Sequence, residues 1–400
     1  MNAQAHKYVI VGGGLAGASA AQAIRELDKA GPILLLCAEE HLPYDRPPLT
    51  KKLWFAKKTV EQIFLLDRAF CDKNGVSLEL GAKATEIDRA EKTVRDSKGR
   101  SWRYERLLLA TGGTPRKPDV EGNALAQVCC MRTLDDYLGL RRQAGAGKSA
   151  LVIGGGFIGS EIAAALNVNS VDVTMLFPSE HLCSRVFPAA LGKAVGRVYE
   201  EHGVKILSGD APASVSRAQG RFLTRTRGGC AIESDMVVAG VGIEPDVSLA
   251  KRAGLDVGDG VAVDRYLRTS DAGIYAAGDN CSFPCPALGR RLRFEHWDNA
   301  LSQGRCAGRN MAGARESYDH LPYFFSDLFD FGYEAVGEVD SRLETSADWQ
   351  KENHTGVITY LRDGRVRGAM MCNVWDKVEW ARGLIREGER AGSKAATGAL

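Results

Sequence analysis

The feature that most constrains this chain is a glycine motif that occurs twice. The segments "KYVIVGGGLAGASAAQAI" and "SALVIGGGFIGSEIAAAL" each read as an apolar strand, a glycine turn and a helix of small residues. Both fit the spacing G-x-G-x-x-G, with Gly12, Gly14 and Gly17 in the first copy and Gly154, Gly156 and Gly159 in the second.

The spacing has a physical cause. The first glycine permits a tight turn, the second lets backbone amides approach a pyrophosphate, and the third lets the helix pack closely on the strand. The N-terminus of the helix then faces the negative charge. Because the motif occurs twice in strand–turn–helix context, about a domain apart, we predict two dinucleotide sites rather than two ligand-free turns.

The rest of the chain indicates several domains, since 400 residues exceed what one hydrophobic core usually organises. Apolar strands that end in glycines recur at 106–118, 235–246 and 273–284. The last of them, "GIYAAGD", fits only beside the first nucleotide. From about Ser326 the pattern changes to antiparallel strands with a turn at Asp363-Gly364, followed by an amphipathic helix.

We therefore predict an α/β fold with two Rossmann-like dinucleotide-binding domains, one inserted in the other, plus a C-terminal α+β domain. The expected bounds are 1–120 and 250–325 for the first nucleotide domain, 121–249 for the second, 326–390 for the C-terminal domain and 391–400 for a disordered tail.

Composition excludes several classes of protein. A hydrophobic share of 44% and a charged share of 26% are typical of a globular protein, and a net charge of +2 argues against a nucleic-acid partner. No apolar run approaches a membrane span. The first residues enter a strand at once, which leaves no room for a signal peptide. The ten cysteines are scattered through apolar surroundings and read as reduced thiols, so we expect a cytoplasmic protein.

The cysteines predict no metal centre. Cys281 and Cys285 are spaced for a disulfide or a metal pair, but no second pair or histidine completes a site, so we interpret them as structural. Cys129 and Cys130 are adjacent and cannot form an unstrained bridge.

Further segments in the same order carry a resemblance over almost the whole chain. They are "LPYDRPPLTKKLW", "LLLATGGTPR", "GVGIEPD", "IYAAGD", "RFEHWDNALSQGRCAGRNMAG" and "PYFFSDLFDFGYEAVG". The sequence resembles the FAD-dependent ferredoxin reductases that serve Rieske oxygenases and cytochromes P450, and their relative apoptosis-inducing factor. Both belong to the superfamily of FAD- and NAD-linked pyridine nucleotide-disulfide oxidoreductases. The segment "GAMMCNVWDKVEWARGLI" is closer to the apoptosis-inducing-factor branch.

The resemblance implies roles for two cations in "RPPLTK". Arg46 would lie near the pyrophosphate and adenosine end of FAD, and Lys51 would lie beside flavin N5. Proline is tolerated in a first helical turn, so Pro47-Pro48 can begin a helix that carries Lys51 inward. Glu161 would pair with Lys51 near the nicotinamide, and these two are the expected catalytic residues. The alternative for Arg46 and Lys51 is that both are solvent-exposed turn residues, and the alternative for Glu161 is a carboxylate on a helix surface.

The resemblance also implies the remaining FAD contacts. Asp279 would bind the ribityl chain, a helix over about 298–311 would point its N-terminus at the flavin, and Phe325 replaces the usual tryptophan. The acid for the adenosine ribose could be Glu39 or Glu40; we choose Glu39, 22 residues past Gly17 and close to the ~20 expected. The expected FAD residues are Gly12, Gly14, Leu15, Ala16, Gly17, Glu39, Arg46, Lys51, Ala84, Thr111, Gly112, Arg132, Asp279, His296, Trp297 and Phe325.

The expected contacts of the second nucleotide lie in the second motif and in later segments that the resemblance implies. They are Gly154, Gly156, Phe157, Ile158, Gly159, Glu161, Ser179, Arg185, Gly242 and Glu295. Phe177 stands where the reductases commonly have glutamate, and no arginine is adjacent to it. We therefore favour NADH, with NADPH left open.

The disulfide reductases of the wider superfamily carry a cysteine pair on the first domain's helix, and "RPPLTKKLWF" has none. We therefore expect a ferredoxin–NAD(+) reductase-like flavoenzyme that passes hydride from NADH to flavin N5 and then single electrons to a small [2Fe–2S] ferredoxin. The alternatives are an oxidoreductase for quinone or oxygen and a slow redox sensor like apoptosis-inducing factor. Arg290, Arg291 and Arg293 could form a docking surface, although a solvated loop is the default. Monomer and homodimer are both open.

Overall fold

The computed structural model describes residues 4–390, and the expected tail at 391–400 lies outside them. The chain divides into two compact units. The first contains the residues up to Arg46, Val60–Thr114 and Glu244–Pro322. The second contains Pro47–Thr59, Pro115–Ile243 and the residues from Tyr323 onward. In this division Pro47–Thr59 and the C-terminal strands group with the second unit.

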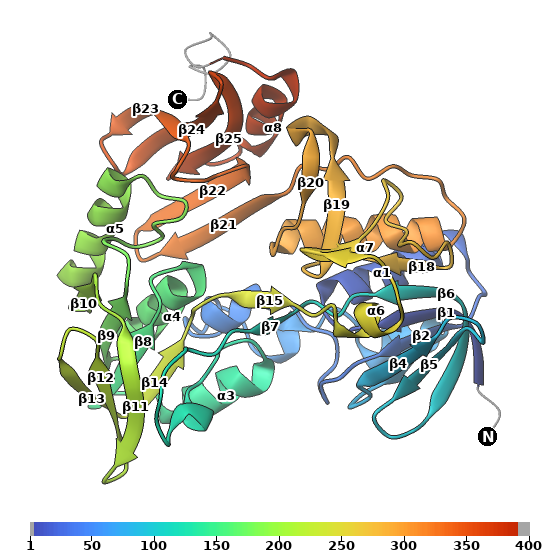
Figure 1. The fold of residues 1–400 in the computed structure, drawn as a ribbon, viewed down its shortest axis with the longest axis horizontal. Coiled ribbons are helices and arrows are strands. Elements are labelled where there is room, and N and C mark those ends of the chain that lie inside the picture. Colours follow the sequence, from blue (N-terminus) through green and yellow to red (C-terminus); the bar gives the residue numbers. More distant parts are fainter. Residues whose placement is uncertain (1–3, 391–400) are drawn as a thin grey trace. The chain divides into compact units, whose positions relative to one another are not determined.

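The first unit is built on a seven-stranded sheet with the order β3-β2-β1-β6-β5-β4, in which β18 also pairs with β6 (Figure 1). Strands β3, β2, β1, β6 and β18 run parallel, and β4 and β5 are antiparallel additions. The strands are β1 (Gln4–Val11), β2 (Ile33–Leu36), β3 (Val76–Glu79), β4 (Ala84–Asp88), β5 (Thr93–Asp96), β6 (Ser101–Leu109) and β18 (Ile274–Ala276). The pairing of β18 with β6 confirms that "GIYAAGD" returns to the first nucleotide fold.

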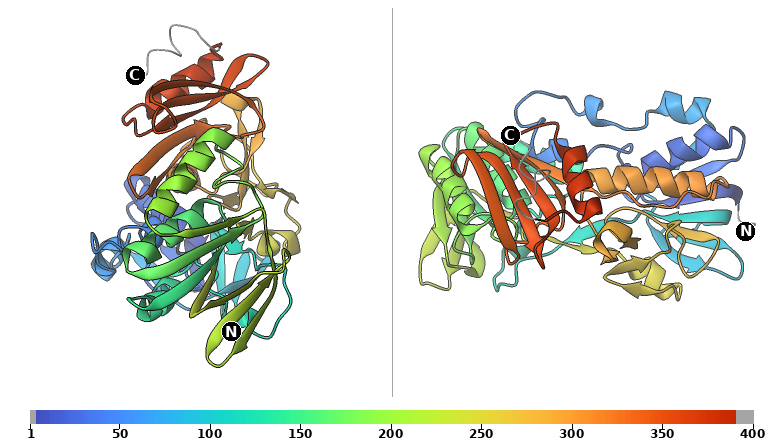
Figure 2. Two further views of the ribbon diagram at one scale, coloured as in Figure 1. Left: turned by 90° about the vertical axis from the view of Figure 1, so that its left-hand side faces the viewer. Right: turned by 90° about the horizontal axis from the view of Figure 1, so that it is seen from above.

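Small residues let two helices of this unit approach closely. Helices α1 (Leu15–Leu27) and α7 (Trp297–Met311) lie side by side (Figure 2). A Cβ on Gly304 would overlap the backbone of Ala16, and one on Gly308 would overlap the backbone of Ala20. The small-residue helix that the first motif predicts is therefore half of a close helix pair, and α7 confirms the helix expected at about 298–311.

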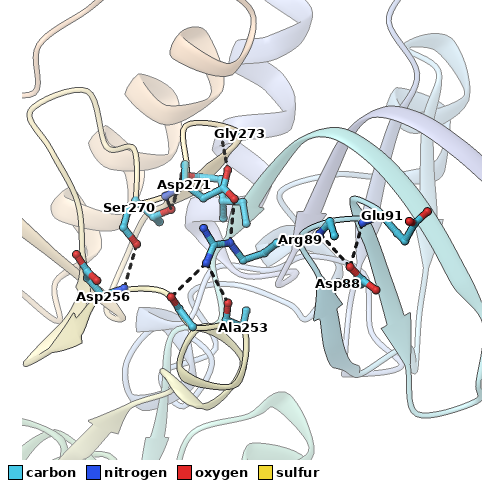
Figure 3. Close-up of polar contacts among 12 residues, drawn as sticks. Asp88, Arg89, Glu91, Ala253, Asp256, Ser270, Asp271 and Gly273 are labelled. Atoms are coloured by element: carbon cyan, nitrogen blue, oxygen red, sulfur yellow. Dashed lines mark hydrogen bonds and ion pairs between the residues drawn. The ribbon is translucent and has the colours of Figure 1, made fainter.

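An arginine connects two further parts of the first unit (Figure 3). Arg89 follows β4; its Nε lies 2.9 Å from Asp271 Oδ2, and its Nη1 donates to the carbonyl oxygens of Ala253 and Gly254. These carbonyls end α6, where a cation is favourable. The other elements of this unit are α2 (Arg68–Lys73), α6 (Ser248–Arg252), β16 (Val257–Gly258), β17 (Gly260–Ala262), β19 (Cys281–Cys285), β20 (Arg290–Leu292) and short 3₁₀ helices at Glu61–Ile63 and Pro286–Leu288.

The second unit contains a four-stranded parallel sheet with the order β10-β9-β8-β14. Its strands are β8 (Lys148–Ile153), β9 (Val171–Phe177), β10 (Lys205–Ser208) and β14 (Met236–Ala239), and its helices are α3 (Leu134–Gln143), α4 (Phe157–Val168) and α5 (Ala189–Glu201). An antiparallel sheet of β11 (Pro212–Ala218), β12 (Arg221–Thr226) and β13 (Ala231–Ser234) shares a buried cluster with it that includes Leu151, Leu176, Val215, Phe222 and Val237.

The C-terminal part of the second unit is a five-stranded antiparallel sheet with the order β21-β22-β25-β24-β23, and α8 packs on β22 and β25 (Figure 1). The elements are β21 (Tyr323–Leu328), β22 (Phe331–Gly337), β23 (Glu344–Lys351), β24 (Thr355–Arg362), β25 (Arg365–Cys372) and α8 (Val378–Glu387). Asp363 and Gly364 both have positive φ, at 53° and 71°, which confirms the turn predicted there.

The chain changes units within β7 (Gly113–Pro115) and β15 (Ile243–Pro245), which pair with each other. Short 3₁₀ helices occur at Pro47–Thr50 and Leu125–Gln127. None of the helices among residues 4–390 is both long enough and apolar enough to cross a bilayer.

Candidate active site

The first glycine turn joins β1 to α1 in the first unit. Gly12 has φ of 121°, and a Cβ there would overlap the carbonyl oxygen of Ala110. A Cβ on Gly17 would overlap the carbonyl of Gly12. Gly14, in contrast, has extended backbone angles and open space where a Cβ would lie. Two glycines are therefore required by packing, while Gly14 leaves room for a ligand at the N-terminus of α1.

The second turn repeats this geometry between β8 and α4. Gly154 has φ of 115° and abuts the backbone of Gly240, and Gly159 abuts the carbonyl of Gly154. Gly156, which precedes α4, again has nothing within 4 Å of a Cβ position. Each unit thus presents an open cradle at the second glycine, as a pyrophosphate requires.

Buried polar atoms mark the surroundings of the first cradle. Asn280 donates to Thr111 Oγ1 at 3.0 Å and to Leu109 O, yet its Oδ1 has no partner among residues 4–390. Gln303 accepts from the amide of Gly278, and its Nε2 likewise has no partner in the described chain. Both residues are fully buried. Unsatisfied buried groups are costly, so these atoms fit a polar ligand such as FAD. Sequence reasoning missed both residues.

The predicted ribose acid is held by its neighbours. Glu39 Oε1 lies 2.8 Å from Arg46 Nη2, and Glu39 Oε2 accepts from the Tyr44 hydroxyl at 2.6 Å. The structure therefore brings two predicted FAD residues, Glu39 and Arg46, into direct contact. Glu40 instead lies against Gly81, on the loop after β3.

Three predicted residues lead into α7 in the first unit. His296 caps the helix, Trp297 Nε1 donates to Asp45 Oδ1 at 2.8 Å, and Glu295 lies 2.6 Å from Arg293. Burial lowers the pKa of His296 to about 4, although Asp279 and Asp298 act in the opposite direction. His296 is therefore neutral at physiological pH, which suits a binding role rather than a proton donor.

The catalytic pair that the resemblance implies is present in the second unit. Lys51 Nζ lies 2.9 Å from Glu161 Oε1, with side chains 11% and 7% exposed. The double proline forms a 3₁₀ helix over Pro47–Thr50 instead of an α-helix, and Lys51 follows directly after it. Lys51 Nζ also lies 4.5 Å from the centre of the Phe325 ring, which keeps an aromatic face beside the cation.

A hollow of about 250 Å³ adjoins the second cradle. Gly154, Pro178 and Val241 line it together with three cations, Arg116, Lys117 and Arg227, and one acid, Asp119. Pro178 directly follows β9. Phe177, which stands where the reductases commonly have glutamate, is only 1% exposed and packs over Gly155. The hollow therefore presents a net positive lining beside a nucleotide turn.

The other predicted residues lie on both units, some of them directly after the two cradles. Leu15 and Ala16 open α1, Phe157 and Ile158 open α4, Ala84 begins β4, and Gly112 precedes β7. Arg132 and Phe325, predicted for FAD, belong to the second unit, while Glu295, predicted for NAD, belongs to the first. Ser179 donates to the carbonyl of His181, the carbonyl of the exposed Arg185 accepts from Ser341, and Gly242 follows β14.

The sequence expectations also concern the cysteines and the candidate metal ligands of the described chain. All ten cysteines are free thiols. Within residues 4–390, no three His, Cys, Asp or Glu side chains gather in a way that could hold a metal ion. Cys281 and Cys285 both lie buried in β19.

Residues 6–304 match the family described as pyridine nucleotide-disulphide oxidoreductase. The chain belongs to this family. Residues 307–355 match the C-terminal domain described as apoptosis-inducing factor, mitochondrion-associated. That match supports the resemblance to apoptosis-inducing factor, and it lies N-terminal to the segment "GAMMCNVWDKVEWARGLI" at 368–385.

Relatives of this oxidoreductase family include electron-transfer enzymes. A ferredoxin–NAD(+) reductase component of an anthranilate 1,2-dioxygenase system from Burkholderia cepacia is 34% identical, over 96% of this chain and 95% of that protein. Apoptosis-inducing factor 1 from Dictyostelium discoideum is 33% identical, over 95% of this chain and 78% of that protein.

Solved structures agree with the fold of this oxidoreductase. Putidaredoxin reductase, in a covalent complex with putidaredoxin, superposes with a TM-score of 0.90 at 30% identity, over 97% of this chain and 94% of that one. A ferredoxin reductase from Rhodopseudomonas palustris gives 0.86 at 29% identity, over 92% and 91% of the two chains. The predicted α/β class, with two nucleotide-binding folds and a C-terminal sheet, is thereby confirmed.

Proposed function

We propose that the protein is an NADH-dependent reductase that holds FAD on the first unit, at Gly12–Gly17, and NADH on the second, at Gly154–Gly159. The two open cradles, at Gly14 and Gly156, are the observation that carries the proposal, because one chain with two such cradles can bind two dinucleotides. The proposal includes the contact residues predicted for each nucleotide and the predicted domain bounds, except that Pro47–Thr59 groups with the second unit. FAD, when bound, accepts a hydride from a nicotinamide nucleotide and releases electrons singly.

The chain's own residues supply orientation and charge. Arg46 and Glu39 would bind the adenosine end of FAD, and Asn280 and Gln303 offer buried polar atoms to it. In the second unit Lys51 provides a fixed cation, which would stabilise negative charge that develops on the nearest ligand. Glu161 holds this cation in place without having to transfer a proton.

NADH is the proposed donor. Ser179 and Glu180, rather than an arginine, follow β9, and a carboxylate there opposes a ribose phosphate. The cationic hollow at Arg116, Lys117 and Arg227 would receive the adenosine half. Because these cations could also attract a ribose phosphate, NADH and NADPH should be compared side by side.

The proposed acceptor is a small iron–sulfur ferredoxin. No cysteine occurs between Arg46 and Phe55, so electrons would leave for another molecule rather than for a disulfide in that segment. Two relatives are named as reductases of such systems, and one solved relative is joined to its putidaredoxin. Arg291 donates to the carbonyl oxygens of Val263 and Ser282, and Arg293 forms ion pairs with Asp259 and Glu295. Because these arginines are bonded within the first unit, we do not place the docking surface there.

Ten free cysteines support a reducing compartment such as the cytoplasm.

Stopped-flow mixing with NADH or NADPH tests the donor, and a panel of ferredoxins, quinone and oxygen tests the acceptor. Rapid bleaching of flavin absorbance by NADH, followed by ferredoxin reduction, is the expected result. A colourless protein, or a flavin that NADH does not bleach, would refute the proposal.

The match at residues 307–355 favours a second candidate, a slow redox sensor. Slow turnover with a changed size on gel filtration would support that sensor instead.

A further inference from the structure

The carboxylate of Glu161 receives three donors in the second unit, of which Lys51 is only one. Thr50 Oγ1 donates to Oε2 at 2.6 Å, and Ser326 Oγ donates to Oε1 at 2.6 Å. Thr50 is 4% exposed and Ser326 is 2% exposed. Each carboxylate oxygen therefore has its own hydroxyl donor, shielded from water.

These donors come from distant parts of the chain. Thr50 ends the 3₁₀ helix that carries Lys51, Glu161 lies in the first half of α4, and Ser326 lies on β21 of the C-terminal sheet. Hydrogen bonds to a charged acceptor are short and strong, and two of them on opposite oxygens resist rotation of the carboxylate. The orientation of Glu161 is thus fixed by residues outside the ion pair.

The C-terminal sheet contacts both halves of the pair. The carbonyl oxygen of Phe325 lies 3.5 Å from Lys51 Nζ and its ring centre lies 4.5 Å away, while the next residue, Ser326, binds Glu161. A single dipeptide of β21 therefore touches the cation and the anion. A shift of this strand would move both charges together.

We propose that Thr50 and Ser326 are positioning residues that lock Glu161 in place and thereby set where Lys51 Nζ lies during hydride transfer. The proposal rests on the function proposed above. Its physical basis is that an ion pair in a shielded site stabilises developing charge only when its geometry is fixed beforehand. With the hydroxyls removed, Glu161 can rotate, and Lys51 follows it.

The test uses the flavin-loaded protein and the variants Ser326→Ala, Thr50→Val and Thr50→Ser. Thr359→Val is the matched control, since Thr359 is also buried on the C-terminal sheet but donates only to the backbone carbonyl of Ser346. Each variant is first checked for flavin content. Single-turnover bleaching by NADH is then followed by stopped flow across a range of pH.

We expect Ser326→Ala and Thr50→Val each to slow bleaching about tenfold, which corresponds to about 1.4 kcal/mol in the barrier. Thr50→Ser should recover most of the rate, and Thr359→Val should leave it unchanged. In a Glu161→Ala background, which has no side-chain acceptor, removal of the Ser326 hydroxyl should have little further effect, because the residue acts through Glu161. Urea unfolding, without NADH, is measured for the wild type, Ser326→Ala, the Glu161→Ala variant and the variant with both changes. The free energies of unfolding of these four proteins should show coupling between Ser326 and Glu161.

Two results would overturn the inference. One is bleaching at the wild-type rate in both Ser326→Ala and Thr50→Val, which would limit the hydroxyls to a structural role. The other is an equal slowing by Ser326→Ala with and without Glu161→Ala. If the wild-type flavin itself is not bleached by NADH, the proposed function fails instead, and the unfolding cycle still decides whether Ser326 and Glu161 are coupled.

Discussion

Lys51 Nζ lies 2.9 Å from Glu161 Oε1, and both side chains are almost completely shielded from water. Removal of one partner from a shielded ion pair leaves a costly isolated charge, whereas removal of both does not. We expect Lys51→Met to lower the free energy of unfolding by about 2–4 kcal/mol, and Lys51→Met with Glu161→Gln to lose less. Urea titration measures both, with the exposed neighbour Lys52→Met as control. Equal midpoints for Lys51→Met and Lys52→Met would contradict this expectation.

The two open cradles separate the two nucleotides. Alanine fits at Gly14 and Gly156 without strain, because both have extended backbone angles and empty space at the Cβ position. We expect Gly14→Ala to fold but to lose FAD. Gly156→Ala should keep FAD and raise the KM for NADH about tenfold, since a methyl group would occupy the space of the pyrophosphate.

Flavin absorbance per protein and steady-state kinetics measure these two effects, and each variant controls for the other. Gly17→Ala should instead lower expression or thermal stability, because its Cβ would overlap the carbonyl of Gly12. If Gly14→Ala retained full flavin with unchanged affinity, the first cradle would not be the FAD site.

The lowered pKa of His296, about 4, predicts a stability that depends on pH. In the unfolded chain an ordinary histidine takes up a proton near pH 6.5, whereas folded His296 does so only near pH 4. The unfolded state therefore binds more protons in this window, and stability falls as the pH drops from about 6.5 to 4. We expect His296→Gln to flatten that slope in thermal melts recorded over this range. An unchanged slope would mean that the imidazole is not desolvated.

Arg89 connects the turn after β4 to Asp271 and to the end of α6 (Figure 3). Burial raises the pKa of the Asp271 carboxyl, but hydrogen bonds from Gly273 and Arg89 outweigh this effect, and the pKa is lowered. The Arg89 and Asp271 side chains are 37% and 27% exposed, so the pair should contribute little. We expect Arg89→Ala to lower Tm by a few degrees without altering NADH oxidation. A large loss of activity would assign Arg89 a role that its contacts do not explain.

The sequence was sufficient for the parts of the fold that depend on local patterns. Gly12 and Gly154 predicted their turns because glycine readily adopts φ values such as 121° and 115°, and Asp363-Gly364 predicted its hairpin because aspartate and glycine both tolerate the left-handed region. The return of "GIYAAGD" to the first nucleotide fold was also predicted, whereas its pairing partner β6 was not.

The parts that could not be predicted depend on contacts between distant segments. Thr50 and Ser326 match no spacing rule, since a hydroxyl becomes informative only when its partner Glu161 is placed beside it. Asn280 and Gln303 were missed because burial of an amide cannot be read from its neighbours in sequence. Pro47–Thr59 groups with the second unit because the contacts of Lys51 and Trp54 lie there, including the bond from Asn169 to the carbonyl of Trp54.

The distribution of the thiols has a practical consequence. Of the ten cysteines, Cys230 alone is exposed, and burial raises the pKa of others, such as Cys183, to about 12. A maleimide dye should therefore attach at Cys230, in the same hairpin turn as Arg227, which lines the cationic hollow. The native protein thus carries a fluorescent-labelling position beside its proposed coenzyme pocket, where binding could be followed by emission without engineering a new attachment point.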